Sequence, residues 1–114
     1  MLKPFAEAGA ISIAPYELYQ KLNSHAFWVV FDKEENKESF LLGMKEKDAY
    51  AYIGYIPLHS APMGIKLGNR AGDLPTTEDL AARIVRLPLY ADLAREGLPQ
   101  LLDTMQNVLR SIYG

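Results

Sequence analysis

The last part of the chain carries the pattern that most restricts its fold. Its apolar residues recur at intervals of three and four positions: Leu98, Leu101, Leu102, Met105, Val108, Leu109 and Ile112. This spacing places them on one face of an α-helix about four turns long. Pro99 is tolerated only in the first turn of a helix, so we expect the helix to begin near Gly97 or Leu98. The chain has 114 residues, which is enough for one domain with one modest core. We expect the apolar face of this helix to form part of that core.

Three further segments have the character of β-strands. Residues 26–31 are short, rich in aromatic and β-branched side chains and almost continuously apolar, which is typical of a central strand. Residues 49–58 predict a second strand, in which Gly54 indicates a bulge or a close approach by another group. Residues 85–89 alternate between apolar and other side chains and predict a third strand, which Pro88 places at an edge or a bulge.

The N-terminal part of the chain is weakly patterned. Residues 2–8 predict the end of a helix that Gly9 stops. Residues 11–13 predict a short extended piece that ends before Pro15. We therefore expect residues 1–22 to be a linker or a helix end, and residues 23–114 to form the compact core of a single domain.

Two helices are expected between the strands. Asn36 is the expected cap of a helix that runs to about Lys47, with one narrow buried stripe. The stripe consists of Phe40, Leu41 and Met44. Thr76 and Asp79 resemble a capping box and predict a second, short helix. Its inward residues are expected to be Leu80, Ala81 and Ile84. Residues 60–75 lack periodicity, and a loop of that length in a compact domain is usually a functional lid or a disordered link.

Strands and helices in this order predict an α+β fold. We expect a small antiparallel three-stranded sheet packed on helices, with an amphipathic helix at the C-terminus. Lys and Arg number 12 and Asp and Glu 14, so the net charge of −2 does not suggest a nucleic acid or an anionic membrane as partner. No apolar run approaches the roughly 20 residues that span a bilayer, and no signal peptide is indicated. Cysteine is absent, which excludes a disulfide scaffold, a thiolate metal site and a cysteine nucleophile and fits a reducing, cytoplasmic compartment.

Few side chains suggest chemistry by themselves. The two histidines, His25 and His59, are far apart in sequence, so no metal site is expected. His25 precedes the central strand and is expected to be a hydrogen-bonded residue at a strand end. His59 opens the long loop, where it is either a binding group or an ordinary surface histidine. The tyrosines of residues 50–55 are expected to form a core stripe, with a binding wall as the alternative.

Three other sequence patterns give still weaker indications of a functional site. Ser24 and Ser60 each neighbour a histidine, but sequence neighbours in an extended chain point to opposite faces. The glycines of residues 68–72 match no phosphate-binding loop. The acidic residues of positions 34–38 are expected to be a solvated face.

Three stretches in register resemble the C-terminal small domain of the DegT-type sugar aminotransferases. The first is Ser24-His25-Ala26-Phe27-Trp28. The second is Tyr55-Ile56-Pro57-Leu58-His59 with Pro62, which is similar to the family's Tyr-x-Pro-Leu-His-x-x-Pro turn. The third runs from Thr76-Thr77-Glu78 to Arg86-Leu87-Pro88-Leu89-Tyr90. The resemblance extends from about Ser24 to the end of the chain, and it is greatest to the transaminases of dTDP-4-oxo-6-deoxy-D-glucose.

The resemblance implies a role within a larger enzyme. Family members are pyridoxal-phosphate (PLP) enzymes that aminate keto sugars carried on nucleotides, with glutamate as the expected donor and a homodimer as the expected assembly. The lysine that binds the coenzyme lies in a large domain outside a segment like this one, so we expect the chain alone to bind no coenzyme, to contain no catalytic residue and to be inactive.

Within that enzyme, the resemblance implies that Tyr55 and His59 contact the sugar nucleotide. Gly54 departs from the family, which often has a histidine at that position. Cell-surface polysaccharide biosynthesis is the expected setting. The alternative is a stand-alone α+β ligand-binding or interaction module, which would lack a bare apolar surface.

Overall fold

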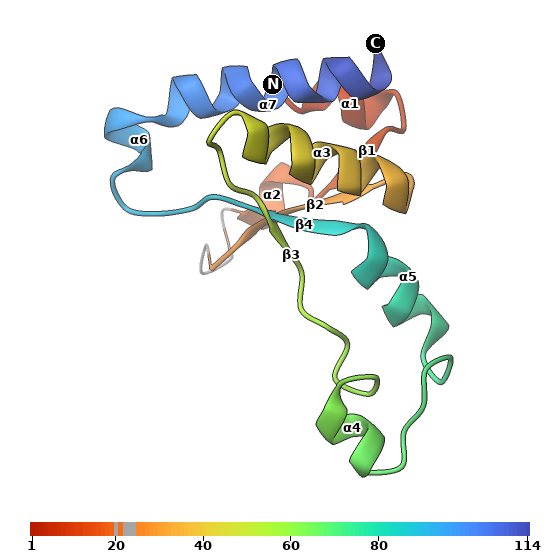
Figure 1. Cartoon of the computed structure of the whole chain (residues 1–114). Helices are drawn as coiled ribbons and strands as arrows, with labels where there is room; N and C mark the ends of the chain where they lie inside the picture. The colour runs from red at the N-terminus through yellow and green to blue at the C-terminus, as the bar shows by residue number, and fades with distance from the viewer. Residues whose placement is uncertain (20, 22–24) are drawn as a thin grey trace.

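A four-stranded antiparallel sheet lies at the centre of the molecule (Figure 1). This computed structural model describes residues 1–19, 21 and 25–114, so Ser24 lies outside the described residues. The strands are β1 (Ile11–Ile13), β2 (Phe27–Phe31), β3 (Tyr52–Ile53) and β4 (Ile84–Leu87). Their order in the sheet is β1-β2-β4-β3. The predicted α+β class is therefore confirmed, and β2 is a central strand as expected.

The helices differ widely in length. They are α1 (Lys3–Glu7), α2 (Tyr16–Tyr19), α3 (Glu34–Glu46), α4 (Pro62–Lys66), α5 (Pro75–Arg83), α6 (Leu93–Glu96) and α7 (Leu98–Tyr113). The helix predicted from the C-terminal periodicity is confirmed as α7. Helices α3 and α7 pack against each other along one side of the sheet (Figure 1).

The core lies between these two helices and the inner face of the sheet. Its buried residues are Ile11, Val29, Phe31, Phe40, Met44, Val85, Leu87, Met105, Val108 and Leu109. The rings of Phe31 and Phe40 have centroids 5.1 Å apart, which joins β2 to α3 directly. The predicted stripe of α3 is confirmed, because Phe40 and Met44 are buried and Leu41 packs against them.

The sheet has one more strand than the expected three. The additional strand is β1, which pairs with β2 from Ile11 opposite Phe31 to Ile13 opposite Val29. The sequence marks these residues only as a short extended piece, because three residues are too few to show an alternating pattern. The first residues also pack against the core through Leu2 and Phe5, and the helix end predicted over residues 2–8 is present there as α1.

Several element ends differ from the prediction. The second strand is far shorter than residues 49–58, because only Tyr52 and Ile53 pair with β4. Helix α3 begins before Asn36, which was expected to cap it. The carboxylate of Asp32 instead accepts hydrogen bonds from the Lys33 backbone N–H at 2.9 Å and the Asn36 amide at 2.8 Å.

The capping box predicted at Thr76 is also wrong. Helix α5 begins at Pro75, and its N-cap residue, Leu74, makes no side-chain capping bond. Asp79 pairs with Arg83 one turn further along the helix instead of folding back on the first turn. Leu80 is exposed. Ile84 is the first residue of β4 and is half-buried.

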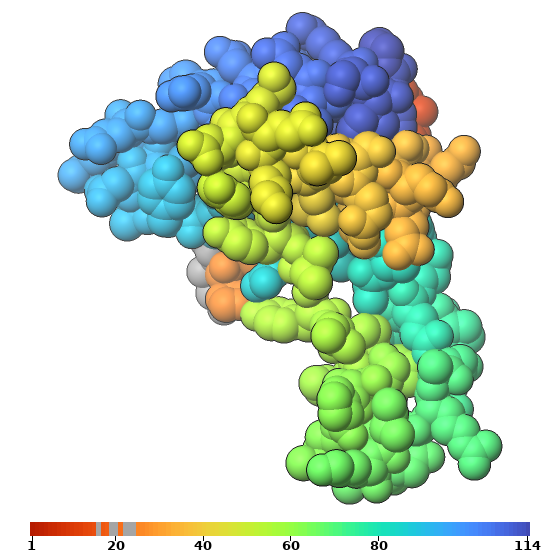
Figure 2. All heavy atoms as spheres, viewed as in Figure 1, coloured from red at the N-terminus to blue at the C-terminus, as the bar shows by residue number. Residues whose placement is uncertain are grey.

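Residues 54–74, which we call the arm, project from this core. Figure 1 shows the arm running away from the sheet, turning at α4 and returning to α5, and Figure 2 shows it as a separate lobe. The molecule is accordingly elongated, with extents of 46 × 32 × 28 Å. The long loop predicted over residues 60–75 is thus an ordered projection that contains α4.

Candidate functional site

One carboxylate oxygen holds the two limbs of the arm together. Glu78 Oε1 on α5 lies 2.6 Å from His59 Nε2 on the outgoing limb. The same oxygen accepts the backbone N–H of Gly72, on the returning limb, at 2.6 Å. His59 is only 8 % exposed, so the alternative of an ordinary surface histidine is wrong. We call this arrangement of His59, Gly72 and Glu78 the clasp.

The clasp favours the ionised form of the Glu78 carboxyl. The hydrogen bond from His59 lowers the pKa of Glu78 below its usual value, and the Gly72 N–H lowers it further. Because a carboxylate is an acceptor, the proton of the His59–Glu78 contact lies on Nε2. The clasp therefore fixes which nitrogen of His59 donates inside the arm.

Close packing around Gly64 makes the turn at α4 rigid. A side-chain carbon at Gly64 would lie 2.1 Å from the carbonyl oxygen of Leu58 and 2.5 Å from that of His59. Only glycine fits where backbone approaches backbone so closely. Asn69 closes the turn, because its backbone N–H and its side-chain amide both donate to the Gly64 carbonyl at 3.1 Å.

Tyr55 stands at the root of the arm and is held from β4. The guanidinium carbon of Arg86 lies 4.6 Å from the centroid of the Tyr55 ring. Arg86 also donates to the Tyr55 hydroxyl at 3.3 Å and to the Ile53 carbonyl at 3.2 Å. Tyr55 nevertheless remains 71 % exposed. Arg86 covers one face of the Tyr55 ring and fixes its orientation, while most of the ring remains open to solvent.

The tyrosines of residues 50–55 are not a core stripe, contrary to expectation. Tyr50, Tyr52 and Tyr55 are all exposed, because β3 is a two-residue strand at the edge of the sheet with both residues exposed and the chain leaves the sheet after Ile53. The close approach predicted at Gly54 is confirmed, since a side-chain carbon there would lie 2.6 Å from Ile84. The alternative of an aromatic wall therefore fits the exposure of these rings.

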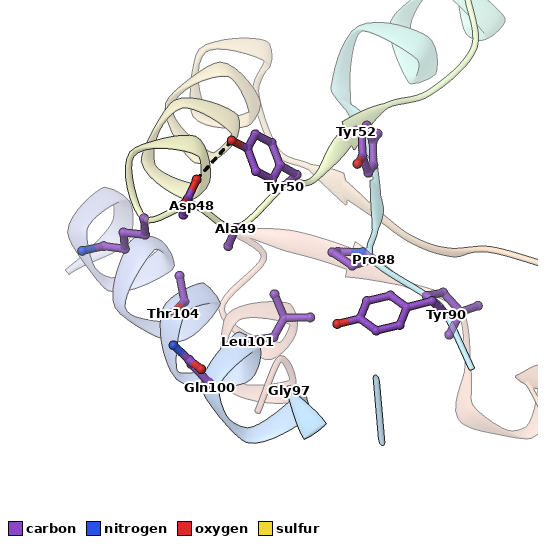
Figure 3. A pocket seen from close by; sticks show the side chains of 12 residues that line it. Asp48, Ala49, Tyr50, Tyr52, Pro88, Tyr90, Gly97, Gln100, Leu101 and Thr104 are labelled. Carbon is purple, nitrogen blue, oxygen red and sulfur yellow. Dashed lines mark hydrogen bonds between the residues drawn. The ribbon is translucent and has the colours of Figure 1, made fainter. Parts of the chain in front are cut away.

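Tyr50 and Tyr52 line a pocket of about 560 Å³ between the start of α7 and the edge of the sheet (Figure 3). Tyr90 forms the opposite wall, and Leu101 lies between them at the base. A second pocket, of about 340 Å³, lies at the root of the arm and is lined by Tyr55, Glu78 and the beginning of α3.

The arm carries an unusual amount of exposed apolar surface. Its exposed large apolar side chains are Tyr55, Ile56, Leu58, Met63, Ile65, Leu67 and Leu74. Leu58 is 85 % exposed, although the next residue in the chain, His59, is buried. An apolar projection of this kind is typical of an interaction surface.

The lysines of the chain do not fit PLP. Six of the seven lysines are exposed on the surface, among them Lys66 on α4. The seventh, Lys37, is buried, but its ammonium is held by the Glu38 carboxylate at 2.7 Å and lies 3.9 Å from that of Glu34. The sequence pattern gave no sign of that burial, because Lys37 lies in a run expected to face solvent. Glu34 and Glu38 are exposed, as expected for a solvated face.

Other kinds of site find no support in the part of the chain that the structure describes. Over these residues, no three His, Asp or Glu side chains come together as metal ligands would. None of the helices over the same residues has the length and apolar character needed to cross a membrane. His25 precedes β2 and is exposed.

Comparison with known proteins connects this fold to one group of enzymes. The sequence profile of the DegT/DnrJ/EryC1/StrS aminotransferase family matches residues 2–106. A dTDP-3-amino-3,4,6-trideoxy-alpha-D-glucose transaminase of Micromonospora megalomicea is 26 % identical over 92 residues, which are 79 % of this chain and 25 % of that protein. A pleiotropic regulatory protein of Geobacillus stearothermophilus is 25 % identical over 104 residues, or 90 % of this chain and 27 % of that one.

Solved structures share the fold. A Streptococcus pneumoniae protein described as a sugar aminotransferase, in its PLP form, superposes with a TM-score of 0.74 at 16 % identity, over 96 % of this chain and 29 % of that one. The aminotransferase TlmJ of Streptoalloteichus hindustanus gives a TM-score of 0.73 at 18 % identity, again over 96 % and 29 %. The chain thus spans about a quarter of the length of the proteins it matches.

Proposed function

The chain belongs to the DegT/DnrJ/EryC1/StrS aminotransferase family, and we propose that it works as the C-terminal small domain of a PLP-dependent enzyme that aminates a nucleotide-linked keto sugar. The observation that carries this proposal is the family match over residues 2–106 of a chain that corresponds to only a quarter of its relatives. The coenzyme and its lysine then belong to polypeptide outside these residues, which agrees with the unsuitable setting of Lys37 and Lys66.

The arm is the part of the domain that meets the rest of the enzyme. Its apolar side chains are exposed here, and burying them against a large domain would remove that surface from water. A module that works alone has no comparable reason to project Leu58, Leu67 and Met63 into solvent. This surface favours the small-domain role over the alternative of a stand-alone binding module.

Tyr55 and His59 are the proposed substrate contacts. Tyr55 presents an oriented and largely exposed ring, which suits packing against a hexose. His59 has Nε2 engaged by Glu78, so Nδ1 is the atom left for the substrate: in the neutral ring it accepts a hydrogen bond from a sugar hydroxyl, and only in the imidazolium would it donate one to a phosphate oxygen. Because His59 is buried within the arm, this contact requires the substrate to lie against the arm itself.

The proposed substrate is a dTDP-linked 4-keto-6-deoxyhexose, and glutamate is the proposed amino donor. Support comes from the motif over residues 55–62 and from the relative that is named as a dTDP-amino-sugar transaminase. A homodimeric, cytoplasmic enzyme of cell-surface polysaccharide biosynthesis is the corresponding setting.

Substitutions in the complete aminotransferase test these roles. Tyr55→Ala and His59→Ala should each raise KM for the sugar nucleotide about tenfold or more while leaving KM for glutamate unchanged, since the donor has no need of the arm. Leu42→Ala, on the exposed side of α3, is the matched control and should change neither constant. A His59→Ala enzyme with unchanged KM and kcat for the sugar nucleotide would remove His59 from the site.

A further inference from the structure

Three tyrosine rings line the pocket of about 560 Å³ beside the start of α7 (Figure 3). Tyr50 follows α3, Tyr52 lies on β3 and Tyr90 follows β4, so the rings come from three separate segments. All three residues are more than half exposed, so packing in the core does not occupy their faces. The Tyr90 hydroxyl lies close to Gly97, where a side-chain carbon would be 3.4 Å from it. Figure 3 shows this ring pointing across the pocket toward Leu101.

A carboxylate with unused acceptor capacity lines the same pocket. Asp48 Oδ1 accepts a hydrogen bond from the Tyr50 hydroxyl at 3.2 Å. Over the part of the chain that the structure describes, no ion pair includes Asp48. Its φ of 59° is a left-handed conformation that glycine adopts at lower cost. The acid is therefore present at a position where the backbone itself does not favour it over glycine.

The rest of the lining indicates which kind of cation fits. Pro88, Leu89 and Leu101 supply apolar surface. Such surface cannot replace the hydrogen bonds to water that a primary ammonium group would lose on entry. A quaternary ammonium group has no N–H, and its methyl groups can contact aliphatic side chains as well as rings. The negative faces of aromatic rings attract a cation of this type. Gln100 and Thr104, on α7, add polar groups that can bond to a hydroxyl substituent.

We propose that Tyr50, Tyr52, Tyr90 and Asp48 form an aromatic cage for a quaternary ammonium group, such as that of choline. The rings contact the methyl groups of the ligand, and the carboxylate balances its charge. Lys47, the other charged residue of the lining, is exposed and opposes a bound cation. This inference does not rest on the proposed function, because none of these residues belongs to the arm.

A titration with choline and two analogues tests the cage. Choline is added to the 114-residue chain, and the tyrosine ring resonances are followed by NMR spectroscopy. We expect saturable shifts for Tyr50, Tyr52 and Tyr90 but not for Tyr55, whose ring lies at the root of the arm. The neutral analogue in which a carbon atom replaces the nitrogen should bind at least about fivefold more weakly. Ethanolamine, which has the charge but no methyl groups, should also bind more weakly than choline.

Paired substitutions separate the ring from the charges. Tyr90→Leu should weaken choline binding at least about fivefold, whereas Tyr90→Phe, which keeps a ring, should change it less than about twofold. Asp48→Asn should weaken it as well, and asparagine is accepted at a positive φ. Glu35→Gln, an exposed acid at the other end of α3, should have no effect. Lys47→Gln should strengthen binding, because a like charge is removed. Circular-dichroism melting of each variant confirms that it is folded.

Equal affinity for choline and its neutral analogue would overturn the proposal, because the pocket would then bind by apolar contact alone. Equal binding by Tyr90→Leu and Tyr90→Phe would also overturn it, as would weaker binding by Lys47→Gln. The same holds if no saturable shift occurs with choline up to about 0.1 M. None of these results bears on the proposed function, which is tested by turnover of the complete enzyme with Tyr55 and His59 substituted.

Discussion

Glu78 is the residue through which acid should loosen the arm. Its folded-state pKa is lowered by His59 and Gly72, so the clasp contributes stability above the ordinary glutamate pKa. That stability is lost as the pH falls through the lowered value, because a protonated carboxyl no longer attracts the His59 donor. Amide exchange of residues 58–74, corrected for its intrinsic pH dependence, should therefore accelerate in this acid range.

Glu78→Gln provides the comparison for this pH effect. The amide keeps the shape of the side chain but cannot titrate, so the arm of the variant should exchange faster at neutral pH and lose the acid-dependent step. An acid step that persists in Glu78→Gln would assign the effect to another group. Glu96→Gln, on α6, should behave as the unaltered chain.

Tyr113 connects the end of α7 to the residues that flank β1 and β2. Its hydroxyl lies 3.0 Å from the Ala10 carbonyl and 2.5 Å from the Asp32 carboxylate. Burial and the neighbouring Asp32 raise the pKa of Tyr113 far above its usual range, so the hydroxyl stays a donor at any ordinary pH. Tyr113→Phe should lower the free energy of unfolding by about 1–3 kcal/mol in urea denaturation. Tyr90→Phe, on an exposed ring, should change it by less than about 0.5 kcal/mol.

The environment of single residues was the least predictable from the sequence. His59 is buried because Glu78, 19 positions away, comes to meet it, and nothing in the local sequence indicates that pairing. The burial of Lys37 likewise depends on how α3 packs, since its own neighbours are polar.

At the level of elements, helix α4 should be sensitive to a single added methyl group. Gly64→Ala would place a carbon against the backbone oxygens of Leu58 and His59, which cannot move aside as a flexible side chain can. We expect a local cost of about 1–3 kcal/mol. Limited proteolysis should then cut within residues 58–74 at least several times faster, with the sheet left intact. Met63→Ala, at an exposed neighbouring position, should be cut at the original rate.

The packing of α3 gives a matched pair of core and surface substitutions. Phe40 is 1 % exposed and contacts Phe31, whereas Leu42 on the same helix is 59 % exposed. Phe40→Ala should lower the free energy of unfolding by about 3–5 kcal/mol, which is enough to unfold many domains of this size. Leu42→Ala should stay within about 0.5 kcal/mol. Equal effects of the two variants would contradict the burial described for α3.

The elements with the clearest sequence pattern were the most predictable. Helix α7 follows from its period of about 3.6 residues, and strand β2 follows from a short apolar run rich in aromatic and β-branched side chains. Strand β1 and helix α4 span three and five residues, so they are too short to show a period and depend on the neighbours they pack against. The second strand was predicted too long because the apolar residues beyond Ile53 belong to the arm, where they remain exposed.

For the whole molecule, the central claim is a division of labour. We propose that these 114 residues supply the arm that meets the substrate, and that the lysine that binds the coenzyme belongs to polypeptide outside them. The fold class followed from the sequence, whereas the exposed arm emerged only from the three-dimensional arrangement. In the proposed function, the exposed apolar side chains of the arm form one side of its contact with the large domain.

One measurement tests that division directly. The 114-residue chain is incubated with equimolar PLP, reduced with borohydride and analysed by peptide mass spectrometry for pyridoxyl–lysine. The account predicts only scattered, substoichiometric labelling of exposed lysines such as Lys66. Stoichiometric labelling of a single lysine, together with amino transfer to a dTDP-linked keto sugar by the chain alone, would contradict it.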